Sequence, residues 1–172
     1  MPIITIKINE KLKEKNITVY RLSKIIDYSQ SSLSDMIKGK ISFSKNVIKK
    51  LLPILEVSRD EFNSWIVADK YPKEFIQLAI EAKKTKNKDY KLILTAKIDE
   101  LLKPKGLSRT AFSKQIKHSQ SSFNNAITGK ESLSKNLMIK ISTALEIPIE
   151  QLQAWAVADK YSLKILMLAV KV

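Results

Sequence analysis

The stretch SQSSLSDMIKGK occupies residues 29–40, and a near-copy, SQSSFNNAITGK, occupies residues 119–130. Each begins with a Ser that can cap the start of a helix. Each contains a Gly, Gly39 or Gly129, that can end a helix in the left-handed conformation. The segments therefore predict two short helices of the same design, which cover residues 30–38 and 120–128.

The predicted helices are apolar on one face and carry mostly small polar side chains on the other. Leu33 and Ile37 share the apolar face at i and i+4. The opposite face holds Ser31, Ser34, Asp35 and Lys38 in the first helix and Ser121, Asn124, Asn125 and Thr128 in the second. Ser and Asn are poor helix formers, so helix stability does not explain them. A binding surface is the favoured interpretation, and a solvated polar face is the alternative.

The two segments belong to a longer internal repeat. Shifted by 90 residues, the chain aligns with itself without a gap, and 33 of the 80 pairs from Ile3/Ile93 to Ala82/Val172 are identical. Two copies of this size indicate two small domains rather than a solenoid. We predict an N-terminal domain at residues 1–83, a basic linker at 84–91 and a C-terminal domain at 92–172.

Hydrophobic spacing predicts an all-α fold with about five to six helices in each repeat. The start of the first repeat, IITIKI, alternates like a strand, whereas its counterpart LILTAKIDELL has helical spacing. Because one fold must suit both copies, we predict a helix in each. Pro53 is expected to interrupt and kink the helix that begins near Ser44. The tryptophans, Trp65 and Trp155, are expected in the core.

Composition limits the classes of protein that this chain can be. The net charge is +14, from 31 basic and 17 acidic residues, and a basic surface attracts polyanions. Solvated lysines that bind nothing are the alternative. The chain has no cysteine, which excludes disulfides and thiolate metal sites. No apolar run is long enough to span a bilayer, and no signal peptide is evident. We expect a cytoplasmic, nucleoid-associated protein with no membrane partner.

The segment TVYRLSKIIDYSQSSLSDMIKGK resembles the helix-turn-helix core of the Cro and phage-repressor (XRE-like) family. The resemblance covers roughly residues 4–62 and 94–152. It implies two tandem helix-turn-helix domains that bind double-stranded DNA, with residues 30–38 and 120–128 as recognition helices. The family commonly has Gly in the turn, where this chain has Asp27 and Lys117.

The resemblance also implies roles for individual residues. Gln30 and Gln120 match a first base-reading position, and a Gln amide can pair with adenine N6 and N7. The complete base-reading set is Gln30, Ser31, Ser34, Asp35, Lys38, Gln120, Ser121, Asn124, Asn125 and Thr128. The phosphate-contacting set is Thr18, Lys40, Lys45, Asn46, Ser108, Arg109, Lys130, Lys135 and Asn136.

Together these features predict a sequence-specific transcriptional regulator, with repression favoured because blocking a promoter requires only occupancy. Asp35 against Asn125, and Lys38 against Thr128, predict two similar but non-identical half-sites. The alternatives are a protein-interaction adaptor or antitoxin-like module, and a nonspecific nucleoid-type DNA or RNA binder. No catalytic residue, metal ligand or cofactor is predicted, and His118, the only histidine, aligns with Tyr28. The apolar C-terminal segments are expected to form an intramolecular pseudo-dimer of the repeats or to pair two chains.

Overall fold

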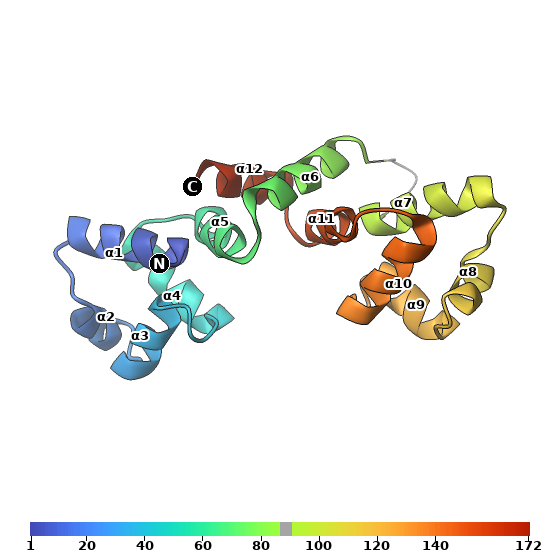
Figure 1. Cartoon of the computed structure of the whole chain (residues 1–172). Helices are drawn as coiled ribbons and strands as arrows, with labels where there is room; N and C mark the ends of the chain where they lie inside the picture. Colours follow the sequence, from blue (N-terminus) through green and yellow to red (C-terminus); the bar gives the residue numbers. More distant parts are fainter. Residues whose placement is uncertain (87–90) are drawn as a thin grey trace. The chain divides into compact units, whose positions relative to one another are not determined.

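The computed structural model describes residues 1–86 and 91–172 (Figure 1). Within these residues twelve α-helices and one 3₁₀ helix occur, and there is no strand. The predicted all-α class, with two helix-turn-helix domains in tandem, is confirmed. Among the described residues, no helix is both long enough and apolar enough to cross a lipid bilayer.

The two repeats contain six α-helices each in the same order, and the second also contains a 3₁₀ helix. The first holds α1 (Ile3–Glu14), α2 (Val19–Ile25), α3 (Gln30–Ile37), α4 (Lys45–Leu55), α5 (Arg59–Lys70) and α6 (Lys73–Lys84). The second holds α7 (Ile93–Leu102), η1 (Lys103–Lys105), α8 (Arg109–Gln115), α9 (Gln120–Ile127), α10 (Lys135–Leu145), α11 (Ile149–Lys160) and α12 (Leu163–Lys171). Lys84, the first residue of the predicted linker, is helical, and residues 87–90 of that linker lie outside the described residues.

The ambiguous first segment, IITIKI, is helical, as comparison of the two repeats predicts. In α1, Ile4, Ile8 and Leu12 are buried at four-residue spacing. The expectation that Pro53 interrupts its helix is wrong, since α4 runs through this residue to Leu55, and the expected kink stays a prediction. Pro53 lies in the last turn, where its missing N–H removes a single hydrogen bond from the end of the helix.

The chain forms two compact units whose boundaries differ from those of the repeats. The first unit comprises Met1–Pro72 together with Met167–Val172, and the second comprises Lys73–Leu166. Helix α6, from the end of the first repeat, therefore belongs to the second unit. The end of α12, from the second repeat, belongs to the first. The division into domains at residues 1–83 and 92–172 stays a prediction about which segments fold independently.

The core of the first unit is built from the apolar faces of α1 to α5. Phe62 in α5 is fully buried and meets Phe43 edge to face, with ring centroids 5.4 Å apart. Trp65 is 3% exposed and joins the same cluster, so its predicted core position is confirmed. Leu33 from α3 is also fully buried there. The core thus anchors the underside of the predicted recognition helix.

In the second unit, α6 packs against α11. Ile76, Ala79 and Ala82 of α6 are buried, and small alanine side chains allow close approach of the two helices. The ammonium of Lys83 donates a hydrogen bond to the carbonyl oxygen of Ala158. Burial lowers the pKa of Lys83, and the nearby carboxylate of Asp159 opposes that shift. The last helix of the first repeat therefore completes the core of the second unit.

An aspartate near the end of α5 and of α11 caps the first helix of the same repeat. Asp159 Oδ1 accepts from the backbone N–H of Ile93 at 2.7 Å, and Oδ2 accepts from that of Leu94 at 2.9 Å. Asp69 makes the equivalent pair of hydrogen bonds to the start of α1. Because Pro2 and Leu92 provide no side-chain cap, these carboxylates satisfy helix donors that would otherwise lack partners.

Candidate nucleic-acid interface

Helix α3 begins at a serine cap and buries one face in the first unit. The Ser29 hydroxyl accepts from the N–H of Ser32, and Leu33, Met36 and Ile37 are buried. On the opposite face, Gln30, Ser31 and Lys38 are exposed, while Ser34 and Asp35 are half-buried. The first turn of the helix contains no acidic residue. The five predicted base-reading residues of the first repeat therefore share one accessible helix face.

Helix α9 repeats this arrangement in the second unit. Ser119 accepts from the N–H of Ser122 at 3.1 Å, and Phe123, Ala126 and Ile127 are buried. On the opposite face, two of the predicted base-reading residues are exposed and three are half-buried. The exposed pair is Gln120 and Ser121, and the half-buried residues are Asn124, Asn125 and Thr128. The Oδ1 atom of Asn124 is buried and has no hydrogen-bond partner within the described part of the chain.

The turn before each recognition helix has the same geometry in both repeats. Asp27 and Lys117 take positive φ values of 49° and 50°, the conformation that Gly often supplies. The N–H of Tyr28 donates to the carbonyl of Ser23 at 2.9 Å, and that of Asp27 donates to Lys24 at 3.2 Å. These two bonds form a Schellman motif at the end of α2. Replacement of the usual Gly therefore leaves the turn intact.

A lysine from the helix that follows each recognition helix donates a hydrogen bond to the turn. Lys50 of α4 donates from Nζ to the carbonyl of Ile26 at 2.7 Å. Lys140 of α10 donates to the carbonyl of Lys117 at 2.9 Å. A cation bonded to the end of a short helix also interacts favourably with the helix dipole. Lys50 and Lys140 occupy equivalent positions of the two repeats, and this identity is the signal in the sequence for their shared role.

Several predicted base-reading side chains already have partners within their own unit. Asp35 Oδ1 forms an ion pair with Lys40 Nζ at 3.2 Å. Asn125 Nδ2 donates to Glu131 Oε1 at 2.8 Å. The hydroxyl of Thr128 donates to the carbonyl of Asn124 at 2.6 Å, back into its own helix. These interactions limit the orientations that the side chains offer to a ligand.

The predicted phosphate-contacting residues lie around the recognition helices. Thr18 and Ser108 cap α2 and α8, where their hydroxyls accept from the N–H groups of Arg21 and Ala111 at 3.1 Å. Every other member of the set except Arg109 is exposed: Lys40, Lys45, Asn46, Lys130, Lys135 and Asn136. The lysines of this set can contact phosphate through their charge, and Lys45 and Lys135 are the first residues of α4 and α10.

Arg109 has a different environment from the rest of this set. Its Nε donates to Asp99 Oδ1 at 2.7 Å, and Nη2 donates to Asp99 Oδ2 at 2.5 Å. The two side chains are 33% and 21% exposed. A fork-shaped pair of this kind holds the guanidinium against α7. Contact of Arg109 with phosphate would therefore require sharing or breaking this ion pair.

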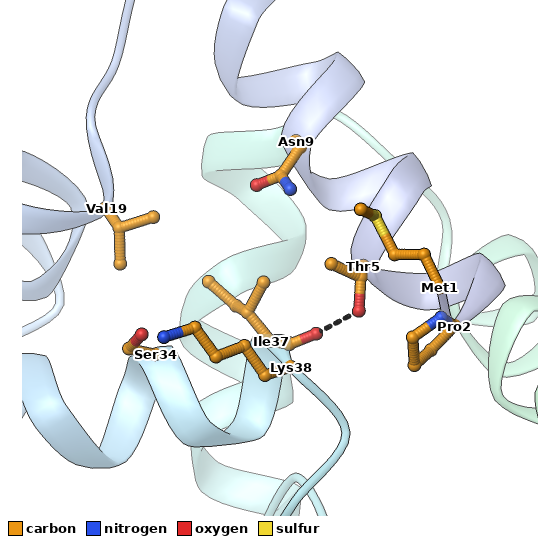
Figure 2. A pocket seen from close by; sticks show the side chains of 8 residues that line it. All are labelled: Met1, Pro2, Thr5, Asn9, Val19, Ser34, Ile37 and Lys38. Atoms are coloured by element: carbon orange, nitrogen blue, oxygen red, sulfur yellow. Dashed lines mark hydrogen bonds between the residues drawn. The ribbon is translucent and has the colours of Figure 1, made fainter.

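The first repeat has Asn9 and Val19 at the positions of Asp99 and Arg109. Here a pocket opens between α1, the start of α2 and the end of α3 (Figure 2). Lys38 and Ser34, both predicted base-reading residues, line it together with Thr5. Figure 2 also shows the hydrogen bond from the Thr5 hydroxyl to the carbonyl of Ile37, at 2.5 Å. The two repeats thus differ beside their recognition helices.

In the part of the chain that the structure describes, neither unit shows a cluster of side chains suited to metal binding. Among the described residues, no three His, Asp or Glu side chains lie close enough together to hold a metal ion. His118 Nε2 lies 3.2 Å from the hydroxyl of Ser122 and thus interacts with α9 from the preceding turn. The geometry is that of two helix-turn-helix elements, each with a polar, accessible second helix.

Comparison with known protein families agrees with this geometry. The model of the Cro/C1-type HTH DNA-binding domain matches residues 7–68 and again residues 97–156. The chain therefore belongs to this family and carries its domain twice. A domain of this type suggests DNA binding and is typical of non-enzymatic regulators. No curated protein and no solved structure matches the chain.

Proposed function

We propose that this protein is a sequence-specific regulator of transcription that binds double-stranded DNA with α3 and α9. The observation that carries this proposal is the exposed Gln-Ser pair at the start of both recognition helices, Gln30–Ser31 and Gln120–Ser121. Residues at the start of the second helix of this motif contact base edges in the major groove. A Gln amide there can form two hydrogen bonds with adenine.

The charge distribution supports DNA as the partner. The net charge is +14, and exposed lysines flank both recognition helices. Such cations contact phosphates and fix the protein on the duplex without reading sequence. Sequence is then read by the outward residues of α3 and α9. Because these residues differ at Asp35/Asn125 and Lys38/Thr128, the proposed operator consists of two related but non-identical half-sites.

Repression is the proposed mode of regulation. Occupancy of a promoter excludes other proteins from the same DNA, and this requires only binding. The proposed location is the cytoplasm, in association with the nucleoid. The proposal also includes an intramolecular pair of repeats, in which one chain supplies both recognition helices. A homodimer through the C-terminal helices is the alternative assembly.

Selection of duplexes from a random pool tests this function. The wild type, the double variant Gln30→Ala/Gln120→Ala and the control Gln77→Ala are compared at near-physiological salt. Gln77 is exposed on α6, outside the recognition helices. We expect the wild type and the control to enrich two related half-sites and the double variant to lose this enrichment. Binding without enrichment would indicate a nonspecific DNA-binding protein, and absence of binding would leave the adaptor alternative.

A further inference from the structure

In each recognition helix, one predicted base-reading side chain bonds to a residue that follows the helix. Asp35 and Asn125 occupy equivalent positions in the two repeats. The carboxylate of Asp35 pairs with Lys40 at 3.2 Å, whereas the amide of Asn125 donates to Glu131 at 2.8 Å. The partners are different residues, because Glu131 corresponds to Ile41 in the first repeat. The two repeats thus constrain the same reading position by different chemistry.

Glu131 forms two hydrogen bonds with Asn125. Its backbone N–H donates to the carbonyl of Asn125 at 3.1 Å, next to the bond from Lys130 at 2.9 Å. Its side-chain Oε1 accepts from Nδ2 of Asn125. The backbone bonds belong to the end of α9 and place the Glu131 side chain beside the amide. The Glu131 side chain therefore loses little further conformational freedom when it bonds to Asn125.

The carboxylate of Glu131 determines the orientation of the Asn125 amide. An ionised carboxylate only accepts hydrogen bonds, so it binds the Nδ2 end of Asn125 and not the Oδ1 end. Within the described residues, Oδ1 receives no hydrogen bond. Nδ2 carries two hydrogens, and Glu131 uses one of them. The half-buried amide therefore offers an acceptor and one remaining donor.

We propose that Glu131 is a positioning residue that orients Asn125 to read a base with an exocyclic amine, foremost adenine. This inference rests on the proposed function. Adenine presents the N6 amine as a donor and N7 as an acceptor, which match Oδ1 and the remaining Nδ2 hydrogen. Cytosine offers only its N4 amine. Guanine and thymine present acceptors in the major groove at the corresponding atoms, and these would face Oδ1 unfavourably.

The first repeat has an aspartate, Asp35, at this position. The carboxylate of Asp35 can accept from an amine but has no hydrogen for adenine N7. Cytosine is therefore its preferred base. The ion pair with Lys40 offsets the repulsion between Asp35 and the phosphates. The two half-sites are thus expected to carry cytosine and adenine at corresponding positions.

Three substitutions at one site test the role of Glu131. In Glu131→Gln the side-chain amide oxygen can still accept from Nδ2, so this variant is the matched control. Glu131→Ala removes the acceptor. Glu131→Lys replaces it with a donor, which would bind Oδ1 and turn Nδ2 toward the DNA. Glu131 is exposed, so all three variants are expected to fold, and circular dichroism checks this.

The readout is competition binding to the duplex selected by the wild type and to every single-base-pair variant of it. At one position in one half-site, we expect Glu131→Ala to lower discrimination for adenine about tenfold, and Glu131→Gln to keep it. Glu131→Lys is expected to favour guanine or thymine at that position. A merely structural role would weaken binding to all duplexes alike.

Two outcomes would overturn the inference in distinguishable ways. If the wild type reads sequence but Glu131→Ala and Glu131→Lys keep its preference at every position, Glu131 does not orient the reading residue. If the wild type selects no sequence or binds no DNA, the proposed function fails and this inference fails with it.

Discussion

The hydroxyl of Thr95 in α7 donates a 2.7 Å hydrogen bond to the backbone carbonyl of Ile127, the last residue of α9. Both residues are buried. In the first unit, Thr5 makes the same bond to Ile37 at the end of α3. The last carbonyls of a helix lack partners within the helix, so this bond satisfies a buried acceptor. The first helix of each repeat thereby fixes the end of the recognition helix.

Thr95→Val is expected to destabilise the protein by about 1–3 kcal/mol, because it keeps the shape but leaves the carbonyl of Ile127 unsatisfied. Urea unfolding measures the loss. The control is Thr143→Val, at an exposed position in α10, where we expect a change within about 0.5 kcal/mol. Equal stability of the two variants would show that the buried bond contributes nothing.

The capping of α7 by Asp159 leads to a second stability prediction. Asp159→Ala removes the acceptor for the N–H groups of Ile93 and Leu94 and is expected to cost about 0.5–2 kcal/mol. Asp159→Asn retains one acceptor oxygen and should lose less. Thermal unfolding of both variants checks the order. A loss as large in the asparagine variant would indicate that the negative charge, rather than hydrogen bonding, is the important property.

How far the sequence alone predicts this fold can be seen at the start of α1. Taken by itself, IITIKI alternates like a strand, and only the second repeat identifies it as a helix. The serine caps at residues 29 and 119 were predictable because a cap requires only a local side chain and the helix that follows it. Local chemistry and internal comparison together predict the helices α3 and α9.

Contacts between distant elements were not predictable in this way. Asp69 and Asp159 occur in a segment, VADKY, that both repeats share and that lies close to Trp65 and Trp155, for which the sequence predicts a place in the core. Their capping bonds join residues more than sixty positions apart. Such capping pairs depend on how the chain folds back on itself. The pairing of Asn125 with Glu131 is local, but comparison of the repeats gave no signal for it, because the first repeat has Ile41 there.

The pKa of Lys83 gives a prediction for stability at alkaline pH. Burial lowers this pKa below its usual value of 10.5, so the unfolded chain binds more protons than the folded one between the two values. Stability from this group therefore rises as the pH increases through that window. Lys83→Met, which keeps the apolar stem, should remove the rise. Unfolding of both proteins over a pH series that rises toward 10.5 tests this, and parallel curves would contradict it.

The proposed phosphate contacts predict a change in salt dependence. Lys45→Gln/Lys135→Gln removes two exposed cations at the starts of α4 and α10. The slope of log affinity against log salt should become shallower by about 0.9 for each lost contact. The control Lys73→Gln lies on α6 and should leave the slope unchanged. Base preference should be the same in all variants, since phosphate contacts carry no sequence information.

Converting the outer face of α3 into that of α9 should make the two half-sites alike. The triple variant Ser34→Asn/Asp35→Asn/Lys38→Thr supplies the residues found at positions 124, 125 and 128. All three replaced side chains lie on the accessible face, so the core beneath α3 is untouched. Because this face is proposed to make the base contacts, the variant should select two half-sites with nearly the same sequence, and the wild type two that differ.

Duplex selection with each protein measures this directly, and Glu131 makes the outcome more specific. The triple variant still has Ile41 where the second repeat has Glu131, so no carboxylate binds the Nδ2 end of the new amide at position 35. That position should tolerate several bases, whereas adding Ile41→Glu should restore a preference for adenine. Half-sites that stay as different in the triple variant as in the wild type would place sequence reading on residues other than these.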